Sequence, residues 1–380
     1  MSLSPRTMSR SYLLALQVVY LVAIQMSMTI LFPYLRQFFS FPQMSLQMAI
    51  GYMLPILVLP FMHGFAIRSA MLLAFLLATI RTFYLAGVDT AFGLYVFAIL
   101  AGIPNVLFWI PYEILYFEKH DASRHGRHSA TYFAVLSGSG ILIPLVAGFF
   151  ADHWGFKPVF FISACAMIIP FILTLRMPRR YVAVTLKDSL HHLRGIRGLL
   201  LFEGFLWSIP PCIIALSLLT FTRTAGQFGA VSSIVALGAL LLSLPVARWS
   251  DAMRNRTKII YPVYILAAVM LVALGRETSL LWFTIFLLIF SSLRSIAQPV
   301  INALPMDLRT DHAKLYMARQ FLLSIGRVIG FGLTWIFALV NQLFTMYVIY
   351  ALAHGVYLVI VRRAVGGRTL AAPELLPLDA

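Results

Sequence analysis

Residues 92–117 read FGLYVFAILAGIPNVLFWIPYEILYF, and Glu113 is their only charged side chain. The hydrocarbon core of a bilayer is about 30 Å thick, so a helix of about 20 apolar residues crosses it. The stretch is much longer than the roughly ten-residue alternating strand of a membrane barrel. Because hydrocarbon offers the backbone no hydrogen bonds, the segment must satisfy them internally. We therefore predict a transmembrane helix here.

The same pattern recurs along the chain. Of its 380 residues, 61% are hydrophobic and 11% are charged, whereas about a quarter of a soluble domain is charged. We predict an all-α membrane protein with twelve transmembrane helices. The predicted helices cover residues 11–34, 45–62, 69–87, 92–117, 129–151, 157–176, 199–221, 226–247, 259–275, 279–304, 316–340 and 342–361.

Basic residues set the predicted orientation. A formal net charge of +16 would suggest a nucleic-acid partner in a soluble protein, but membrane proteins collect Lys and Arg in their cytoplasmic loops. With the N-terminus inside, most of the 29 Lys and Arg residues, Arg319 among them, fall in cytoplasmic segments. We expect a multi-pass protein of a plasma membrane or bacterial inner membrane, with both termini cytoplasmic and no nucleic-acid partner.

The longest connection divides the chain into two halves. Residues 1–176 and 199–361 each hold six predicted helices, and the tail 362–380 is expected to be disordered. One common offset places Pro111 on Pro299 and Gly138 on Gly326, which suggests a repeat. Repeated six-helix halves are a known transporter architecture. We expect two pseudo-symmetric six-helix bundles around a central cavity.

The linker, residues 177–198, carries the spacing of a capping box at Thr185 and Asp188. Leucines then recur at helical spacing among basic residues, which predicts a short amphipathic helix on the inner membrane surface. The alternative is a merely solvated linker.

One loop resembles a family signature. Residues 247–258 read ARWSDAMRNRTK, a small residue followed by an Asp and spaced basic residues, between predicted helices eight and nine. Together with the six-linker-six layout, this resembles the major facilitator superfamily. The counterpart at residues 62–69, MHGFAIRS, is shortened and has no Asp. Helix five also lacks the Gly-Pro pair of many exporters, so the direction of transport stays open.

The resemblance implies an alternating-access transporter with a gate at this loop. Asp251 and Arg254 are then gating residues, and Asp251 would cap the N-terminus of helix five near Ser129, with Arg127 beside it. The alternative is an ordinary basic cytoplasmic loop.

Glu113 is the first candidate for proton coupling. Asn105, Trp109 and Glu113 are spaced four apart and share one helix face, which the family resemblance would turn toward the central cavity. A Glu balanced between burial and a nearby Arg can take up and release a proton, and Arg294 or Arg127 is the expected partner. The alternative is that Glu113, one turn from the cytoplasm, merely pairs with a basic loop residue.

Glu203 is the second coupling candidate, and Trp207, one turn further on, is expected on the wall of the central cavity. The alternatives to a coupling role are that Glu203 forms an ion pair at the cytoplasmic gate or is simply solvated there.

Other polar residues within spans indicate a cavity wall. Arg294, Gln298 and Asn302 recur every four residues on helix ten, which would be costly against lipid; a ladder of helix–helix hydrogen bonds is the alternative. Gln17 and Gln25 would complete the wall from helix one. Arg81 and Arg327 also fall inside spans, where long side chains can snorkel.

These features predict a secondary active transporter that moves a small solute by alternating access and is driven by protons. An anionic or amphiphilic solute is favoured over a cation or a neutral sugar, because Arg exceeds Glu within the spans. No hydrolytic triad, phosphate loop or metal-ligand cluster is recognisable, and Cys165 and Cys212 lie in apolar stretches, so we expect no enzyme, cofactor, metal or disulfide. A monomer in the bilayer is expected. The alternatives are a lipid flippase or other lipid-handling protein, a proton-coupled multidrug exporter and a membrane scaffold.

Overall fold

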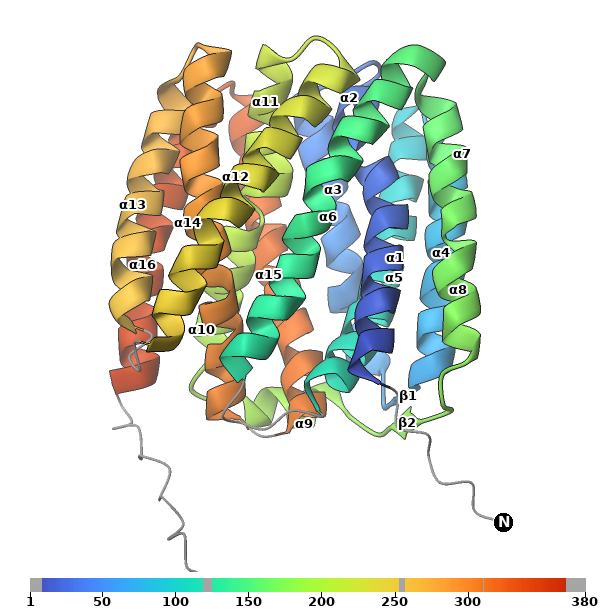
Figure 1. Cartoon of the computed structure of the whole chain (residues 1–380), viewed down its shortest axis with the longest axis vertical. Coiled ribbons are helices and arrows are strands. Elements are labelled where there is room, and N and C mark those ends of the chain that lie inside the picture. Colours follow the sequence, from blue (N-terminus) through green and yellow to red (C-terminus); the bar gives the residue numbers. More distant parts are fainter. Residues whose placement is uncertain (1–8, 119–124, 253–256, 310, 367–380) are drawn as a thin grey trace, which may run out of the picture.

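A computed structural model describes residues 9–118, 125–252, 257–309 and 311–366, without the side chains of 125–128, 242–252, 257–258, 307 and 365–366. Its helices stand side by side in one upright bundle (Figure 1). Within the described part, eleven helical segments are long and apolar enough to cross a membrane. The all-α membrane fold is therefore confirmed, and α12 supplies the remaining span of the predicted twelve.

The first half contains six successive spans. In chain order its helices are α1 (Arg10–Thr29) with α2 (Leu31–Leu35), α3 (Phe41–Val58) with the 3-10 turn η1 (Leu59–Phe61), α4 (Ile67–Leu85), α5 (Ala91–Phe117), α6 (His125–Trp154), and α7 (Phe156–Ala166) with α8 (Ile168–Leu175). The second half also contains six spans. Its helices are α10 (Arg197–Trp207) with η3 (Pro210–Ile214) and α11 (Ala215–Phe221), α12 (Ala225–Ala252), α13 (Thr257–Arg276), α14 (Leu280–Leu308), α15 (His312–Leu339) and α16 (Leu343–Gly366).

The seventh span is broken at Pro210 and Pro211. A proline has no amide hydrogen and clashes with the preceding turn, so two in succession cannot continue an α-helix. The chain forms a π-helical turn here, closed by the Ile214 amide donating to the Ile209 carbonyl at 3.3 Å, before α11 resumes. The break brings both proline rings to the centre of the bundle, where they line a cavity.

One membrane face, here called the linker face, carries the connection between the halves. It lies at the bottom of Figure 1 and holds the strands β1 (Phe65–Ala66) and β2 (Tyr181–Val182) with the helix α9 (Leu186–His192). The Thr185 side chain accepts a hydrogen bond from the Asp188 amide, so α9 begins where the capping spacing placed it. The antiparallel β1–β2 pair was not predicted, since two residues in each strand leave no periodic signal. The opposite side is called the distal face.

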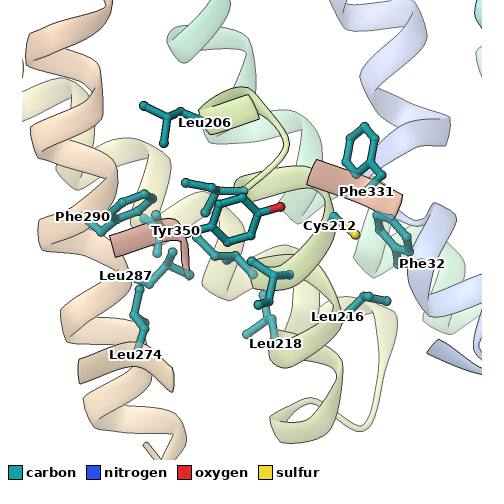
Figure 2. Packing of buried hydrophobic residues seen from close by; sticks show 14 of the residues in the cluster. Phe32, Leu206, Cys212, Leu216, Leu218, Leu274, Leu287, Phe290, Phe331 and Tyr350 are labelled. Atoms are coloured by element: carbon teal, nitrogen blue, oxygen red, sulfur yellow. The ribbon is translucent and has the colours of Figure 1, made fainter. Parts of the chain in front are cut away.

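The two halves pack directly on each other through α6 and α12. A Cβ atom at Gly229 of α12 would lie 2.1 Å from the Pro144 carbonyl oxygen of α6, so only glycine permits this approach. Elsewhere the interior is filled by large apolar side chains. Figure 2 shows Tyr350 of α16 among Leu206, Leu287 and Phe290, with Cys212 beyond its hydroxyl.

Candidate functional site

A central cavity of about 620 Å³ lies between the halves. From the first half, Gln25, Asn105, Trp109 and Glu113 line it, and from the second, Trp207 does. These five were predicted as cavity or coupling residues, and the structure brings them to one wall. Their roles in transport stay predictions.

An ion triad lies at the end of the cavity toward the linker face. Arg319 of α15 contacts Glu203 of α10 at 2.7 Å and Glu113 of α5 at 3.5 Å. Exposed fractions are 5% for Arg319, 2% for Glu203 and 6% for Glu113. The triad therefore joins the two halves inside the protein, because Glu113 belongs to the first half and the other two to the second.

Arg319 corrects the sequence prediction twice. The charge count assigns it to a cytoplasmic segment, although it falls within the predicted helix 316–340, and the predicted partner of Glu113 is Arg294 or Arg127. In the structure α15 begins at His312, so Arg319 lies about two turns inside the helix. Two carboxylates offset its charge, which makes the burial of a guanidinium within a span tolerable.

Further contacts between the halves surround the triad. The Tyr132 hydroxyl of α6 donates to Glu113 Oε1 at 3.2 Å, which holds the carboxylate within the first half. Asn302 Nδ2 of α14 donates to Ser129 Oγ of α6 at 3.2 Å, and the rings of Phe117 and Tyr316 stack 5.6 Å apart. These contacts close the bundle on the linker face.

The distal face is closed by residues that sequence reasoning missed. The Asp152 carboxylate at the end of α6 accepts hydrogen bonds from the amides of Ala225 and Gly226, at 3.0 and 2.9 Å, and so caps α12. Arg36 donates to the carbonyls of Leu219 and Thr222 at the end of the seventh span. Charged residues just beyond an apolar run were the available signal, but nothing in the sequence names their partners.

Gln17 does not lie on the cavity wall as predicted. It is fully buried, accepts a hydrogen bond from the Tyr112 hydroxyl at 3.0 Å and donates to the Tyr132 carbonyl at 3.3 Å. Its amide therefore joins α1, α5 and α6 within the first half. A buried amide needs such partners, and two helices of its own half supply them.

The stripe on α14 does not face one central cavity either. Arg294 lies 4.9 Å over the Trp207 ring and donates to the Leu206 carbonyl at 3.1 Å. With Gln298, Glu203 and His354 it lines a separate pocket of about 20 Å³ inside the second half, large enough for one water. Among the described side chains of the stripe, Asn302 is the one with a hydrogen bond to the other half.

The predicted gating residues lie outside what the structure describes. Arg127 and Asp251 fall within α6 and α12, but their side chains are not among the described ones, and Arg254 is in the undescribed stretch 253–256. The capping of helix five by Asp251 stays a prediction.

Two six-helix halves around a central cavity are an architecture of secondary membrane transporters. The model of the Major Facilitator Superfamily matches residues 13–331, and the chain belongs to that family. The resemblance seen in the sequence is thereby confirmed.

Relatives and solved structures agree with this assignment. The chain is 30% identical over 138 residues to "Multidrug resistance protein MdtG" of Salmonella paratyphi A (strain ATCC 9150 / SARB42), covering 33% of this chain and 34% of that protein. It is 24% identical over 212 residues to MdtG of Klebsiella pneumoniae (strain 342), covering 50% and 51%. The chain thus spans only a third to a half of these relatives' length.

Two solved structures share the fold over nearly the whole chain. The Escherichia coli fucose:proton symporter FucP superposes with a TM-score of 0.66 at 13% identity, covering 94% of this chain and 98% of that one. The human organic anion transporter MFSD10 (TETRAN) also gives 0.66, at 10% identity, covering 93% and 100%. At such identities these likenesses show the fold alone.

Proposed function

We propose that the protein is a proton-coupled transporter that moves a small anionic or amphiphilic solute by alternating access, with the linker face in the cytoplasm. The observation that carries the proposal is the buried Glu113–Arg319–Glu203 triad between the halves. The basic residues of the predicted inner loops support the orientation.

Glu113 is the proposed carrier of the coupling proton. Its bond to Arg319 is the one ion pair between the two halves among the described residues. It lines the central cavity, whereas Glu203 lines the small pocket inside the second half. A proton that enters the cavity therefore has a path to Glu113.

The second carboxylate, Glu203, allows Glu113 to be protonated without leaving Arg319 unpaired. Protonation of Glu113 removes its attraction to Arg319, but Glu203, at 2.7 Å, keeps Arg319 paired. Without Glu203, release of Glu113 would leave a buried cation uncompensated, which is strongly unfavourable. The other charged and titratable groups around Glu113 are Arg327, which also lines the cavity, and the hydroxyls of Tyr132, Tyr112 and Tyr316.

The proposed cycle follows from these contacts. With Glu113 charged, the triad holds the halves together on the cytoplasmic side. With Glu113 neutral, the contacts left across this face among the described residues include the Asn302–Ser129 hydrogen bond and ring packing but no ion pair, so the halves separate there more easily. Return of the proton to the cytoplasm restores the link.

The test uses proteoliposomes and dansylate, a fluorescent naphthalene sulfonate, as the anionic solute. We expect wild type to accumulate dansylate when a pH gradient is imposed, and Glu113→Gln to lose this accumulation while retaining dansylate exchange at equal pH. Exchange does not require the proton to leave. Gradient-driven accumulation by Glu113→Gln at the wild-type rate would rule out Glu113 as the coupling group.

A second candidate function is the export of several drugs. The likeness to proteins named for multidrug resistance favours it, as do the aromatic rings Tyr52, Trp109 and Trp207 on the cavity wall. Efflux of a lipophilic cation such as ethidium, competing with dansylate, would support this reading over the anionic one.

A further inference from the structure

A second chamber lies beside the central cavity, mostly within the first half. It has a volume of about 320 Å³ and is lined from α1, α2, α3, α4 and α5, with Pro211 of η3 from the second half. Tyr52, Asn105 and Trp109 line both spaces, so the chamber and the cavity share a wall. A ligand in this chamber would therefore lie next to the central cavity.

Arg81 of α4 lines the chamber and has no counter-charge there. It is 6% exposed, and its Nε and Nη2 atoms have no hydrogen-bond partner. No Asp or Glu lines the chamber, and among the described residues no carboxylate lies within ion-pair distance of Arg81. The centre of the Phe97 ring lies 6.0 Å from the guanidinium carbon. An Arg buried this way requires a partner that the protein does not supply.

Snorkelling does not account for Arg81. The residue is one turn from the end of α4 at Leu85, close enough for a long side chain to reach the distal face. A snorkelling guanidinium would be exposed at that face, but Arg81 is 6% exposed and lines the chamber.

The rest of the chamber wall suits an anion with an apolar body. Polar groups come from Tyr20, Gln47, Tyr52 and Asn105, whose hydroxyls and amides can donate hydrogen bonds. The rest of the wall is apolar and aromatic, including Phe97 and Trp109. One cation among neutral donors, with apolar surface beside it, matches a single oxyanion attached to an apolar body.

A second unpaired cation stands across the shared wall. Arg327 of α15 lies 4.9 Å over the Tyr52 ring and 5.6 Å over the Trp207 ring, and no ion pair joins it to a described carboxylate. Tyr52 thus has Arg327 on its face while lining the Arg81 chamber. Two arginines without an ion pair among the described residues therefore line the two adjacent spaces, Arg81 the chamber and Arg327 the cavity, and their charge favours a bound anion there.

We infer that the Arg81 chamber binds the oxyanion head, a carboxylate or sulfonate, of an organic anion whose apolar body packs on the neighbouring rings. The inference deepens the proposed transport function and rests on it for the claim that this ligand is the transported solute. The volume of about 320 Å³ limits the body to a ring system or a short chain. A soluble organic anion and a single-chain anionic lipid share this chemistry.

The test is equilibrium binding to purified wild-type protein in neutral detergent. Dansylate is compared with dansylamide, which has the same rings and a neutral sulfonamide, and binding is read as energy transfer from tryptophan to dansyl. Trp109 lines the chamber, so a ligand there quenches it. We expect wild type to bind dansylate at least ten-fold more tightly than dansylamide.

Variants then assign the preference to Arg81. Arg81→Gln should weaken dansylate binding about 10- to 100-fold, as expected for loss of a charged hydrogen bond, and should leave dansylamide unchanged. Arg81→Lys should restore part of the affinity, because the charge is kept while the planar fork is lost. Arg68→Gln, the same change near the start of the same helix and outside the chamber lining, is the matched control and should bind as wild type.

Two results would overturn the inference: no saturable dansylate binding by wild type, or equal affinities for dansylate and dansylamide. Because that comparison uses wild type alone, it holds even if Arg81→Gln fails to fold.

Displacement of dansylate by lysophosphatidylglycerol, but not by lysophosphatidylcholine, would identify a lipid as the source of the anion. Displacement only by naphthalene sulfonate would identify a soluble one. Binding by Glu113→Gln separates this inference from the coupling proposal, since dansylate should still bind there even when gradient-driven uptake is lost.

Discussion

Neutralising Glu113 should open the linker face, and the structure gives the size of the effect. Unit charges 3.5 Å apart attract by about 5 kcal/mol at an effective dielectric constant of about 20. The net value after lost hydration is smaller, about 1.5–3 kcal/mol for a hydrogen bond to a charged group. The larger loss expected for an orphaned buried charge does not arise, because Glu203 stays at 2.7 Å from Arg319. At 1.36 kcal/mol per factor of ten, Glu113→Gln should shift the closed–open equilibrium about 10- to 150-fold.

Accessibility of a cysteine at position 129 measures this shift. Ser129 is fully buried between the halves and hydrogen-bonded to Asn302, so a thiol there reacts only when the linker face opens. In a background with Cys165→Ala and Cys212→Ala, inside-out vesicles carrying Ser129→Cys are treated with a membrane-impermeant maleimide. We expect Glu113→Gln to raise the labelling rate at least ten-fold.

The matched control is Glu118→Gln. Glu118 lies close to Glu113 in sequence and pairs with Arg180 at 2.5 Å, but that pair is exposed and does not join the halves. Exposed pairs contribute about 0–1 kcal/mol, so its labelling rate should stay within about five-fold of the parent. If Glu113→Gln labels no faster than Glu118→Gln, the triad does not hold the linker face closed and the coupling argument fails.

Three further outcomes follow from the contacts described above. Glu203→Gln should stall the cycle by leaving Arg319 with Glu113 alone, so Ser129→Cys labelling should fall below the parent rate; faster labelling would contradict this. Asp152→Ala should remove the cap of α12 and weaken closure of the distal face by about 1–3 kcal/mol. The measurement is maleimide labelling of Ala225→Cys from the distal side, which should become faster. An unchanged labelling rate would show that the cap does not hold that face closed. Gly229→Ala should destabilise the protein by about 1–3 kcal/mol because its Cβ would meet the Pro144 carbonyl, whereas Gly332→Ala, with open space at its Cβ, should not lower the melting temperature; equal melting temperatures would contradict the close packing of α6 on α12.

The sequence by itself determined the spans and the depth of the charged residues in them. Bilayer thickness fixes how many apolar residues a helix needs, so counting along the chain is enough to place the helices. The same one-dimensional pattern placed Glu113 on a face with Asn105 and Trp109, because helical periodicity is local. All three line the central cavity.

Only the tertiary structure decided which groups meet. The sequence places Arg319 near the start of a predicted helix and among the cytoplasmic charges. Only the structure shows that it lies about two turns inside α15, against two carboxylates. Gln17 bonds within its own half, and Arg81 lines a chamber to which several helices contribute. Hydrophobicity sets how deep a residue lies in the bilayer, but the rotation and crossing of helices set its neighbours. Those depend on packing between segments far apart in the chain.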